Sequence, residues 1–452
     1  MRDRLPTLHQ PDFNVDWRPH YERRTVTAAE AIVHIKSGDR VAIARGREPQ
    51  ALGLALAARK DELRGVRVSV PQPGRDFGWY DEGWQDSFEV EVGINMATSR
   101  EALNAHRISL RFNNDLADSH PVYGSNSTLG ADALLIEISP PDEQGFCSFG
   151  ASVWEKRRAI ATAKLVLAEV NPRMIRTYGE NWCHVTEIDF FVQNEAPTGW
   201  GVLSSPREAP PLAKRFAELV SGLVEDGDTV QIGLGTISEW IPRLGAFDNK
   251  VDLGLHTEIT PRGLTRLIKA GVINGKRKTI NVGKCIATAG GGSKEDVEFI
   301  HMNPAYELLA VHNVIHPMVI AQHDNMVAIN QAMAVDFTGQ ITAEGLGGYQ
   351  HSGPGGQPIF AIGSQMARNG RYIVLLPSTA QSGAVSRVMA RLPEGTPVTV
   401  SRNFADIVVT EYGIAYLRWK NWRERAEALV AIAHPDFRAE LRREARRMFW
   451  PD

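Results

Sequence analysis

Residues 254–258 read Gly-Leu-His-Thr-Glu, and Glu258 is the side chain in this chain best placed to do covalent chemistry. It comes directly after the apolar run 251–255, which predicts a buried parallel strand. Ligands of open α/β sheets bind at the carboxyl ends of such strands, where a carboxylate can act as a nucleophile. A lone glutamate there can equally be a solvated group, or an acid ahead of the helix expected near Pro261. These residues alone leave both interpretations open.

Two glycine-rich segments could bind anions close to such a carboxylate. Gly233-Leu234-Gly235 follows one predicted strand and precedes a predicted helix, so its backbone N–H groups could face a phosphate or carboxylate. The alternative interpretation of residues 233–235 is a tight turn that needs positive φ. Residues 345–356 form the densest glycine cluster, whose N–H groups could face a developing negative charge. The alternative for this cluster is a flexible surface loop.

A weak internal repeat indicates how these segments are positioned. Residues 37–46 (Ser-Gly-Asp-Arg-Val-Ala-Ile-Ala-Arg-Gly) resemble residues 226–235 (Asp-Gly-Asp-Thr-Val-Gln-Ile-Gly-Leu-Gly), at an offset of 189 residues. An amphipathic helix precedes each copy, and a second helix and another apolar strand follow it. The preceding helices are expected at 28–35 and 212–224, the following strands at 66–70 and 251–255. A capping box, Thr27-Ala-Ala-Glu30, marks the start of the first helix.

Further short apolar runs predict that both halves of the chain are α/β, with mostly parallel sheets flanked by helices. These strands are expected at 134–138, 164–170, 372–376 and 406–409. A Pro- and Gly-rich linker separates two predicted domains, 1–197 and 206–452. The segment 437–449 has the spacing of an amphipathic helix.

The composition excludes several classes of protein. The chain has 452 residues, of which 43% are hydrophobic and 23% charged, and its net charge is −3, so it supplies no global field for nucleic acid or a membrane. It begins without an apolar leader and has no run long enough to span a bilayer, which indicates a cytoplasmic protein. Cys147, Cys183 and Cys285 have no metal-site spacing, and we expect buried, unpaired thiols and no metal.

Other polar residues have mainly structural interpretations. Arg45 and Arg47 could pair with a carboxylate substrate, although solvated arginines are the more common case. Asp142, after two prolines, predicts a rigid turn. His434-Pro-Asp436 predicts the start of a helix.

Taken together, residues 233–235, 254–258 and 353–356 resemble, in order and spacing, segments of the acetyl-CoA hydrolase/CoA-transferase family, and most closely its 4-hydroxybutyrate CoA-transferase-like branch. The resemblance covers almost the whole chain. Further matching segments are Ser-Pro-Pro-Asp-Glu-Gln-Gly at 139–145, Glu-Val-Asn-Pro at 169–172, Val-Asp-Phe-Thr-Gly-Gln at 335–340, Thr-Glu-Tyr-Gly at 410–413 and Ala-His-Pro-Asp-Phe at 433–437. The resemblance implies two related open α/β domains with the active site in a cleft between them. The first domain would serve the acyl substrate, and the second would carry the nucleophile and the CoA-binding loops.

The resemblance also implies a reaction and its residues. In this family a glutamate attacks the acyl-CoA carbonyl, and the reaction passes through an acyl-glutamyl anhydride and a glutamyl-CoA thioester. By position this role falls to Glu258. The backbone N–H of Gly356 would be an oxyanion donor, with Gly355 beside it. Gly233, Leu234, Gly235 and Ser352 would line the path of CoA, which is a substrate here, with no permanently bound cofactor.

Three departures from the family pattern affect the site. Ile315 stands where the family has an asparagine that supplies a second oxyanion donor, and His312, Asn313 or His316 could replace it. Gln381 stands where a lysine is common, which would weaken a contact with a CoA phosphate. The pair at 113–114 (Asn-Asn) differs from the family near the acyl site.

The sequence therefore predicts a CoA-transferase that moves CoA between a short-chain acyl-CoA and a carboxylic acid. A hydrolase using the same glutamate, or a non-catalytic CoA-binding protein of the same fold, are the alternatives. The acyl group stays open among acetate, 4-hydroxybutyrate, succinate and itaconate, because the loops 72–84 and 111–125 match no pattern. The resemblance also suggests a homo-oligomer, a dimer or a tetramer.

Overall fold

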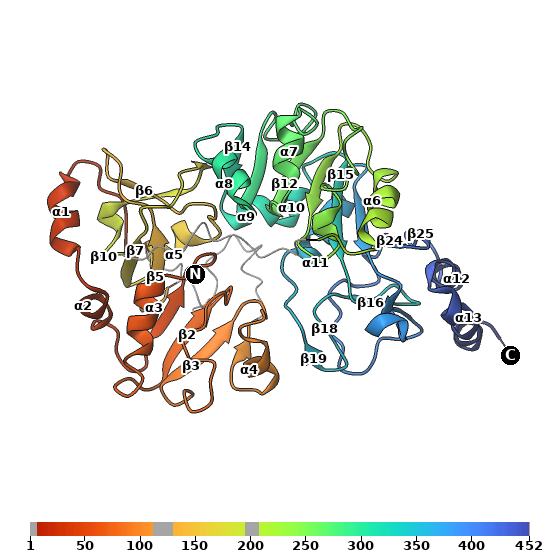
Figure 1. Ribbon diagram of the computed structural model, residues 1–452, viewed down its shortest axis with the longest axis horizontal. Coiled ribbons are helices and arrows are strands. Elements are labelled where there is room, and N and C mark those ends of the chain that lie inside the picture. Colours follow the sequence, from red (N-terminus) through yellow and green to blue (C-terminus); the bar gives the residue numbers. More distant parts are fainter. Residues whose placement is uncertain (1–6, 112–129, 195–207, 452) are drawn as a thin grey trace, which may run out of the picture. The chain divides into compact units, whose positions relative to one another are not determined.

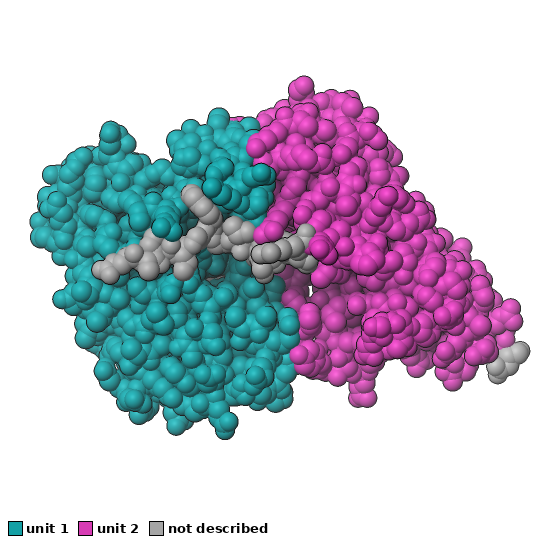
Figure 2. All heavy atoms as spheres, in the orientation of Figure 1, with its two compact units in different colours: residues 1–202, 288–313 teal, residues 203–287, 314–452 magenta. Residues whose placement is uncertain are grey.

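The computed structural model describes residues 7–111, 130–194 and 208–451, which divide into two compact units (Figure 1, Figure 2). Unit 1 comprises residues 1–202 and 288–313, and unit 2 comprises residues 203–287 and 314–452. The chain first passes from unit 1 to unit 2 between residues 202 and 203, close to the linker expected from the sequence. The return of 288–313 to unit 1 has no counterpart in the sequence-based division at 197 and 206.

Unit 1 contains a seven-stranded sheet in the order β10-β7-β5-β1-β2-β3-β4, and every neighbouring pair is parallel. Successive residues of β1 belong to different apolar clusters, Val41 and Ile43 to one and Ala42 to the other, so both faces of the sheet are covered. The strands are β1 (Arg40–Ile43), β2 (Val66–Val70), β3 (Phe88–Val92), β4 (Ser109–Leu110), β5 (Ala133–Ile138), β7 (Leu165–Val170) and β10 (Phe190–Gln193).

The described residues of the first part of the chain, and of the segment that returns to it, form short α-helices. They are α1 (Trp17–Arg24), α2 (Ala28–Ile32), α3 (Gln50–Ala57), α4 (Arg100–Asn104), α5 (Lys156–Thr162), α8 (Lys294–Ile300) and α9 (Val311–Ile315), which ends in unit 2. The predicted capping box is confirmed, since Thr27 and Glu30 exchange hydrogen bonds at the start of α2. Two small pairs complete unit 1: β6 (Phe146–Ser148) with β9 (Trp182–His184), and β8 (Tyr178–Gly179) with β14 (Tyr306–Leu308).

Unit 2 has the strand order β25-β24-β20-β15-β11-β12, parallel except for the edge strand β25. The strands are β11 (Thr229–Ile232), β12 (Gly254–Ile259), β15 (Met326–Gln331), β20 (Arg371–Leu375), β24 (Ile407–Thr410) and β25 (Gly413–Tyr416). β13 (Cys285–Ala289) carries the chain from unit 2 back to unit 1. The helices are α6 (Ala213–Ser221), α7 (Leu264–Lys269), α10 (Pro317–Ile320), α11 (Gln357–Met366), α12 (Trp422–Ile432) and α13 (Pro435–Phe449).

The connectivity of the two sheets bears out the internal repeat. In unit 1, β2 pairs on one side of β1, and β5, β7 and β10 follow in order on the other side. In unit 2, β12 pairs on one side of β11, and β15, β20 and β24 follow in order on the other side. The equivalence of β1 and β11 is the one that the repeated Gly-Asp segments predicted, and the mixed α/β fold with mostly parallel sheets is confirmed.

Small strands in unit 2 form three further pieces. β16 (Ala334–Asp336) lies between β17 (Ile341–Thr342) and β23 (Val388–Met389), β18 (Gly345–Leu346) pairs with β19 (Tyr349–Gln350), and β21 (Thr379–Ala380) pairs with β22 (Val385–Ser386). The structural roles proposed for Asp142 and His434 are confirmed: the Asp142 carboxylate accepts from two turn N–H groups, and His434 caps α13.

Candidate functional site

Glu258 lies inside strand β12 and not after it, which corrects the expected strand bounds. β12 begins at Gly254 because the first residues of the apolar run 251–255 lie before the ladder with β11, where Thr229 pairs with Gly254. The strand is buried from Gly254 to Thr257 and half-buried at Glu258. Glu258 therefore sits at the carboxyl edge of the sheet on a rigid element, which limits where its carboxylate can go.

Gly356 lies directly against the Glu258 carboxylate. A Cβ built on Gly356 would overlap Glu258 Oε2 and lie 3.1 Å from its Cδ, while real Cβ atoms essentially never approach closer than 3.0 Å. The same Cβ would lie 3.6 Å from Ile315 Cδ1. Three residues from β12, α9 and the start of α11 thus meet at one point. The backbone φ of Gly356 is −83°, so close approach and not backbone conformation requires glycine here.

Gly356 is also the N-cap of α11, and no side chain caps this helix. The first N–H groups of a helix have no intrahelical partner, and the helix dipole places partial positive charge at this end. A carboxylate beside this end is stabilised, and negative charge that develops on a neighbouring oxygen would be stabilised as well. The start of α11 is therefore the electrostatic counterpart of Glu258.

The glycine cluster 345–356 has two separate structural roles. Gly347 and Gly348, with φ of 58° and 82°, form the two-residue turn between β18 and β19, as expected for a hairpin of this length. Gly353 and Gly356 are buried and Gly355 is half-buried with φ of 54°, ahead of α11. Only the second part of the cluster reaches the glutamate, and the expected role of its N–H groups toward a negative charge stays a prediction.

Ser352 connects these two parts through its backbone. Its N–H donates to the Glu344 carbonyl at 2.8 Å, and its carbonyl accepts from the Gln350 amide at 2.5 Å. The Ser352 side chain is half-buried. Its predicted contact with CoA stays a prediction.

Gly233 and Gly235 follow β11, but their role differs from both sequence interpretations. Neither has positive φ, and the next helix is only a three-residue 3₁₀ turn (Ser238–Trp240), so an α-helix dipole is absent from this described segment. Glycine is required by close approach instead: a Cβ on Gly233 would overlap Asn330 Oδ1, and one on Gly235 would lie 2.7 Å from Gln331 Oε1. Leu234 between them is exposed.

Sequence reasoning did not single out Asn330 and Gln331, which end β15 beside this turn. The Gln331 amide accepts from Ile237 N–H at 2.8 Å and donates to Thr236 Oγ1 at 3.0 Å. The Asn330 amide pairs with that of Gln231. Two consecutive amides at the carboxyl end of a strand were the available signal, and they hold the glycine turn in place.

Ile315 lies beside Gly356, and its side chain is fully buried. Its hydrocarbon side chain provides no hydrogen-bond donor. Of the suggested replacements, Asn313 donates to the Glu180 carboxylate at 2.8 Å, and His316 accepts the Met318 N–H as the N-cap of α10. Both side chains therefore already have other roles in this structure.

His256 of β12, His323 and Lys278 form a buried cluster. His256 Nε2 lies 2.6 Å from the Val314 carbonyl, next to Ile315, and the His256 ring lies 4.2 Å from that of His323. Burial lowers the pKa of His256 to about 3, and the Lys278 ammonium acts in the same direction. His256 is therefore neutral, with its proton on Nε2, and ties β12 to the segment carrying Ile315.

Gln381 lies in an exposed turn between β21 and β22 with φ of 50°. Its predicted proximity to CoA stays a prediction. Upstream of this turn, Ser378 is buried and donates to the Glu411 carboxylate at 2.5 Å from its hydroxyl and at 2.9 Å from its N–H. These bonds join the segment after β20 to residues 410–413, one of the segments that carried the resemblance, at the end of β24.

In unit 1 the arginines of the repeat are paired and not solvated. Arg45 is 6% exposed and lies 3.7 Å from Glu155, and Arg47 pairs with Glu137. Burial is the physical reason, since both follow β1 at the buried end of a parallel sheet. The following residue, Glu48, accepts from the N–H groups of Gly74 and Arg75, and burial raises its pKa to about 8. The Asn pair at 113–114 lies outside the described residues.

The predicted thiols are buried and unpaired, as expected, although Cys147 and Cys183 face each other across β6 and β9. Over the described ranges no group of three or more His, Cys, Asp or Glu side chains could hold a metal. In the same residues, no helix combines the length and apolar character needed to cross a bilayer.

Known proteins resemble this chain in sequence over almost its whole length. Residues 10–199 match the acetyl-CoA hydrolase/transferase N-terminal domain, and residues 292–445 match the C-terminal domain of the same family. The 4-hydroxybutyrate coenzyme A transferase of Clostridium kluyveri is 38% identical over 437 residues, which are 96% of this chain and 100% of that protein. The succinyl-CoA:cyclohexane-1-carboxylate CoA transferase of Geobacter metallireducens is 35% identical and covers 96% and 97%.

Two solved structures share the fold along almost the whole chain. RipA from Yersinia pestis has a TM-score of 0.85 at 29% identity, covering 96% of this chain and 100% of that one. The 4-hydroxybutyrate CoA-transferase from Porphyromonas gingivalis has a TM-score of 0.78 at 31% identity with the same coverage. The chain therefore belongs to the acetyl-CoA hydrolase/transferase family and is a CoA-transferase.

Proposed function

We propose that this CoA-transferase moves CoA from a short-chain acyl-CoA to a carboxylic acid by ping-pong chemistry in which Glu258 is the covalent nucleophile. The observation that carries the proposal is the position of Glu258 Oε2 against Gly356, at the uncapped start of α11. A carboxylate held on a strand beside the backbone N–H groups at the start of a helix has the parts that covalent acyl transfer needs.

The first half-reaction then follows from this arrangement. A Glu258 oxygen attacks the thioester carbonyl, and the carbonyl oxygen becomes an oxyanion that accepts a hydrogen bond from the Gly356 N–H. The C–S bond breaks, leaving an acyl-glutamyl anhydride and the CoA thiolate. The thiolate attacks the glutamyl carbonyl, which releases the original acid and forms a glutamyl-CoA thioester.

The second half-reaction is the reverse with a new acid. Its carboxylate attacks the glutamyl-CoA carbonyl and displaces the thiolate. The thiolate then attacks the acyl carbon of the new anhydride, and Glu258 leaves as a carboxylate. No atom is oxidised or reduced, so this chemistry requires neither a metal nor a redox cofactor. A donor of the oxyanion-hole type typically contributes about 3 kcal/mol to lowering such a barrier.

Trapping the covalent intermediate tests this proposal. The protein is incubated with acetyl-CoA, treated with hydroxylamine, digested and analysed by mass spectrometry, with Glu427→Gln on the exposed surface of α12 as the matched control. A hydroxamate on the peptide containing Glu258 is expected in the wild type and the control, and Glu258→Gln should lose turnover. Full transferase activity in Glu258→Gln without any adduct would refute the proposal.

Hydrolysis by the same glutamate is the competing reaction, and Ile315 is the observation that bears on it. The missing amide donor removes one contribution to anhydride formation, and the buried hydrocarbon side chain of Ile315 lies beside Gly356 in its place. Adding an acceptor acid to acyl-CoA separates the two reactions. A transferase forms the new acyl-CoA faster than free CoA accumulates, whereas a hydrolase releases CoA at the same rate with or without acceptor.

The identity of the acids is a separate part of the proposal. Acetate, 4-hydroxybutyrate, succinate and itaconate are the candidates, compared by kcat/KM in a matrix of donors and acceptors. We further infer a cytoplasmic homo-oligomer, and light scattering of the purified protein checks its assembly.

A further inference from the structure

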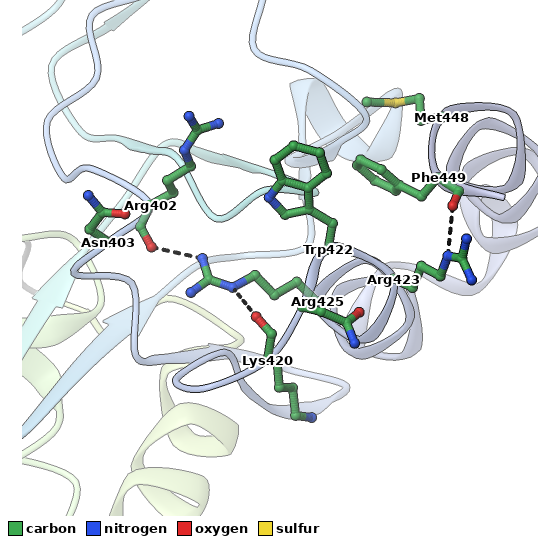
Figure 3. Close-up of a pocket in the computed structure, with 9 residues that line it drawn as sticks. Arg402, Asn403, Lys420, Trp422, Arg423, Arg425, Met448 and Phe449 are labelled. Carbon is green, nitrogen blue, oxygen red and sulfur yellow. Dashed lines mark hydrogen bonds between the residues drawn. The ribbon is translucent and has the colours of Figure 1, made fainter.

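A hollow of about 700 Å³ on unit 2 lies apart from the residues described above (Figure 3). It is formed by the segment before β24, the connection from β25 to α12, the start of α12 and the end of α13. Its lining residues are Arg402, Asn403, Lys420, Asn421, Trp422, Arg423, Arg425, Met448 and Phe449. None of them belongs to the set around Glu258.

The charge of this hollow is one-sided. Four of its nine lining residues are cations and none is a carboxylate. Among the residues that the structure describes, none of these four cations forms an ion pair, although the whole chain has a net charge of −3. Arg425 shows the consequence, because burial lowers its pKa and the positive charge of Arg402 acts in the same direction. Unpaired cations gathered in one concave site favour an anion.

Two of the cations have structural contacts, which leaves Arg402 as the most available one. The Arg425 guanidinium donates to the backbone carbonyls of Thr338 and Arg402, at 2.7 and 2.8 Å, and Arg423 donates to that of Phe449 at 2.7 Å. Arg402 itself is exposed, and Figure 3 shows its side chain on one side of the Trp422 ring. A guanidinium in this position can bind a phosphate through two hydrogen bonds.

The aromatic wall adds a second kind of recognition. The Trp422 side chain is 56% exposed, and its ring lies 5.8 Å from that of Phe449, on the side opposite Arg402 (Figure 3). An exposed indole beside a cation is suited to stack on a flat base whose phosphates reach the arginine. Asn403, which also lines the hollow, supplies an amide donor and acceptor for the edge of a base, whereas the Asn421 amide oxygen caps α12.

The residue before Lys420, Trp419, is exposed and has an unusual backbone conformation. It is 95% exposed and has a φ of 65°, a left-handed conformation that is a genuine outlier for a bulky residue. Such strain costs about 1–3 kcal/mol, and an exposed side chain gains no packing within the chain to offset it. Trp419 directly precedes Lys420 in the chain, and Lys420 lines the hollow.

From these features we infer that this hollow is a binding site for a free purine nucleotide, with the base stacked on Trp422 and the phosphates bound by Arg402 and Lys420. The inference goes beyond the transferase reaction and does not depend on Glu258. It assigns to unit 2 a second ligand site, distinct from the acyl-CoA site and suited to an effector.

Isothermal titration calorimetry of the full-length protein with ADP tests this inference, with pyrophosphate and adenosine as half-ligands. ADP should bind more tightly than either half, since both ring and charge contribute. Trp422→Ala should weaken ADP binding by about 10-fold to 100-fold, which is the range of a lost base-stacking contact. Arg402→Ala should weaken it by about 10-fold or more. Arg443→Ala, an exposed arginine elsewhere on α13, is the matched control and should change nothing.

Three outcomes would overturn the inference. The first is no ADP binding to the wild type at millimolar concentration. The second is equal affinity for pyrophosphate and ADP, since the base would then not be recognised. The third is a raised KM for acyl-CoA in Arg402→Ala, which would make this hollow part of the acyl-CoA site. Unchanged transferase kcat and KM in Arg402→Ala, together with loss of ADP binding, would support a separate site and would hold whether or not Glu258 is the nucleophile.

Discussion

Replacing Gly356 by alanine tests the geometry of the site with the smallest possible change. The added methyl group would overlap Glu258 Oε2 and lie 3.1 Å from Cδ, whereas ordinary contacts of a Cβ begin at 3.4 Å. To relieve the overlap, the Glu258 carboxylate must retreat by about 1 Å or more. A misplacement of ~1 Å can cost about 100-fold in rate, because covalent attack requires near-contact geometry.

We therefore expect kcat/KM of Gly356→Ala to fall by about 100-fold or more, equivalent to ~3 kcal/mol of transition-state stabilisation. Alanine keeps the backbone N–H, so the loss reports the position of Glu258 and not the removal of a donor. With φ of −83° and ψ of 0°, Gly356 has a conformation that alanine adopts without strain. Substitution at the cap of α11 should lower stability by no more than about 1 kcal/mol.

The assay is steady-state transfer from acetyl-CoA to an acceptor acid, combined with thermal unfolding. Gly222→Ala is the control, because a Cβ there lies 3.6 Å from the Leu219 carbonyl and causes no overlap. Wild-type kcat/KM in Gly356→Ala, with an unchanged Tm, would show that the carboxylate does not act from the observed position. A large fall in Tm would instead locate the effect in folding, and the two measurements separate these cases.

Three further predictions concern the surroundings of the site and the stability of unit 1. Ile315→Asn should raise kcat, by up to about 100-fold if the new amide faces the oxyanion, and a lower Tm without any gain in kcat would contradict this. His256→Ala should leave the buried Val314 carbonyl without its partner, so we expect a loss of ~1–3 kcal/mol of stability and a lower kcat at unchanged KM, with unchanged kinetics contradicting the positioning role. Glu48, with its pKa raised to about 8, contributes stability fully below pH 4.5, and this contribution is lost as the pH rises through 8. The Tm of Glu48→Gln should therefore rise relative to wild type between pH 5 and 8, and a constant difference would contradict the raised pKa.

The strands of the central sheets could be predicted because parallel strands buried on both faces are continuous apolar runs. Val66–Val70 was predicted with its observed bounds, and the strands at 133–138 and 165–170 were within one residue. The repeat could be predicted because Gly-Asp before a strand is a local signal. The chain's return to unit 1 at 288–313 could not, because it depends on which distant strands pair.

The candidate site was predicted in part. The order of segments brought together Glu258, Gly356 and Ile315, and the structure places all three in contact range. The reason for Gly233 and Gly235 was wrong, because close approach to a side chain from another strand has no local signature. Buried pairing of Arg45 was likewise invisible, since its partner Glu155 lies more than a hundred residues away in the chain.

Ile315 places a hydrocarbon side chain where the family has an asparagine amide, which reduces the number of groups that could donate a hydrogen bond to an oxyanion. In the proposed mechanism, the absence of a side-chain donor at that position makes stabilisation of the oxyanion depend on backbone N–H groups at the start of α11, which cannot rotate away. Their direction is fixed by the helix, which packs against β15 and β20. Glu258 is fixed by β12 in the same sheet, with its strand tied to the Ile315 segment through His256. The proposed nucleophile and the proposed donor are thus both held by the backbone of unit 2, so changes in packing around α11 should alter kcat even where they touch no substrate.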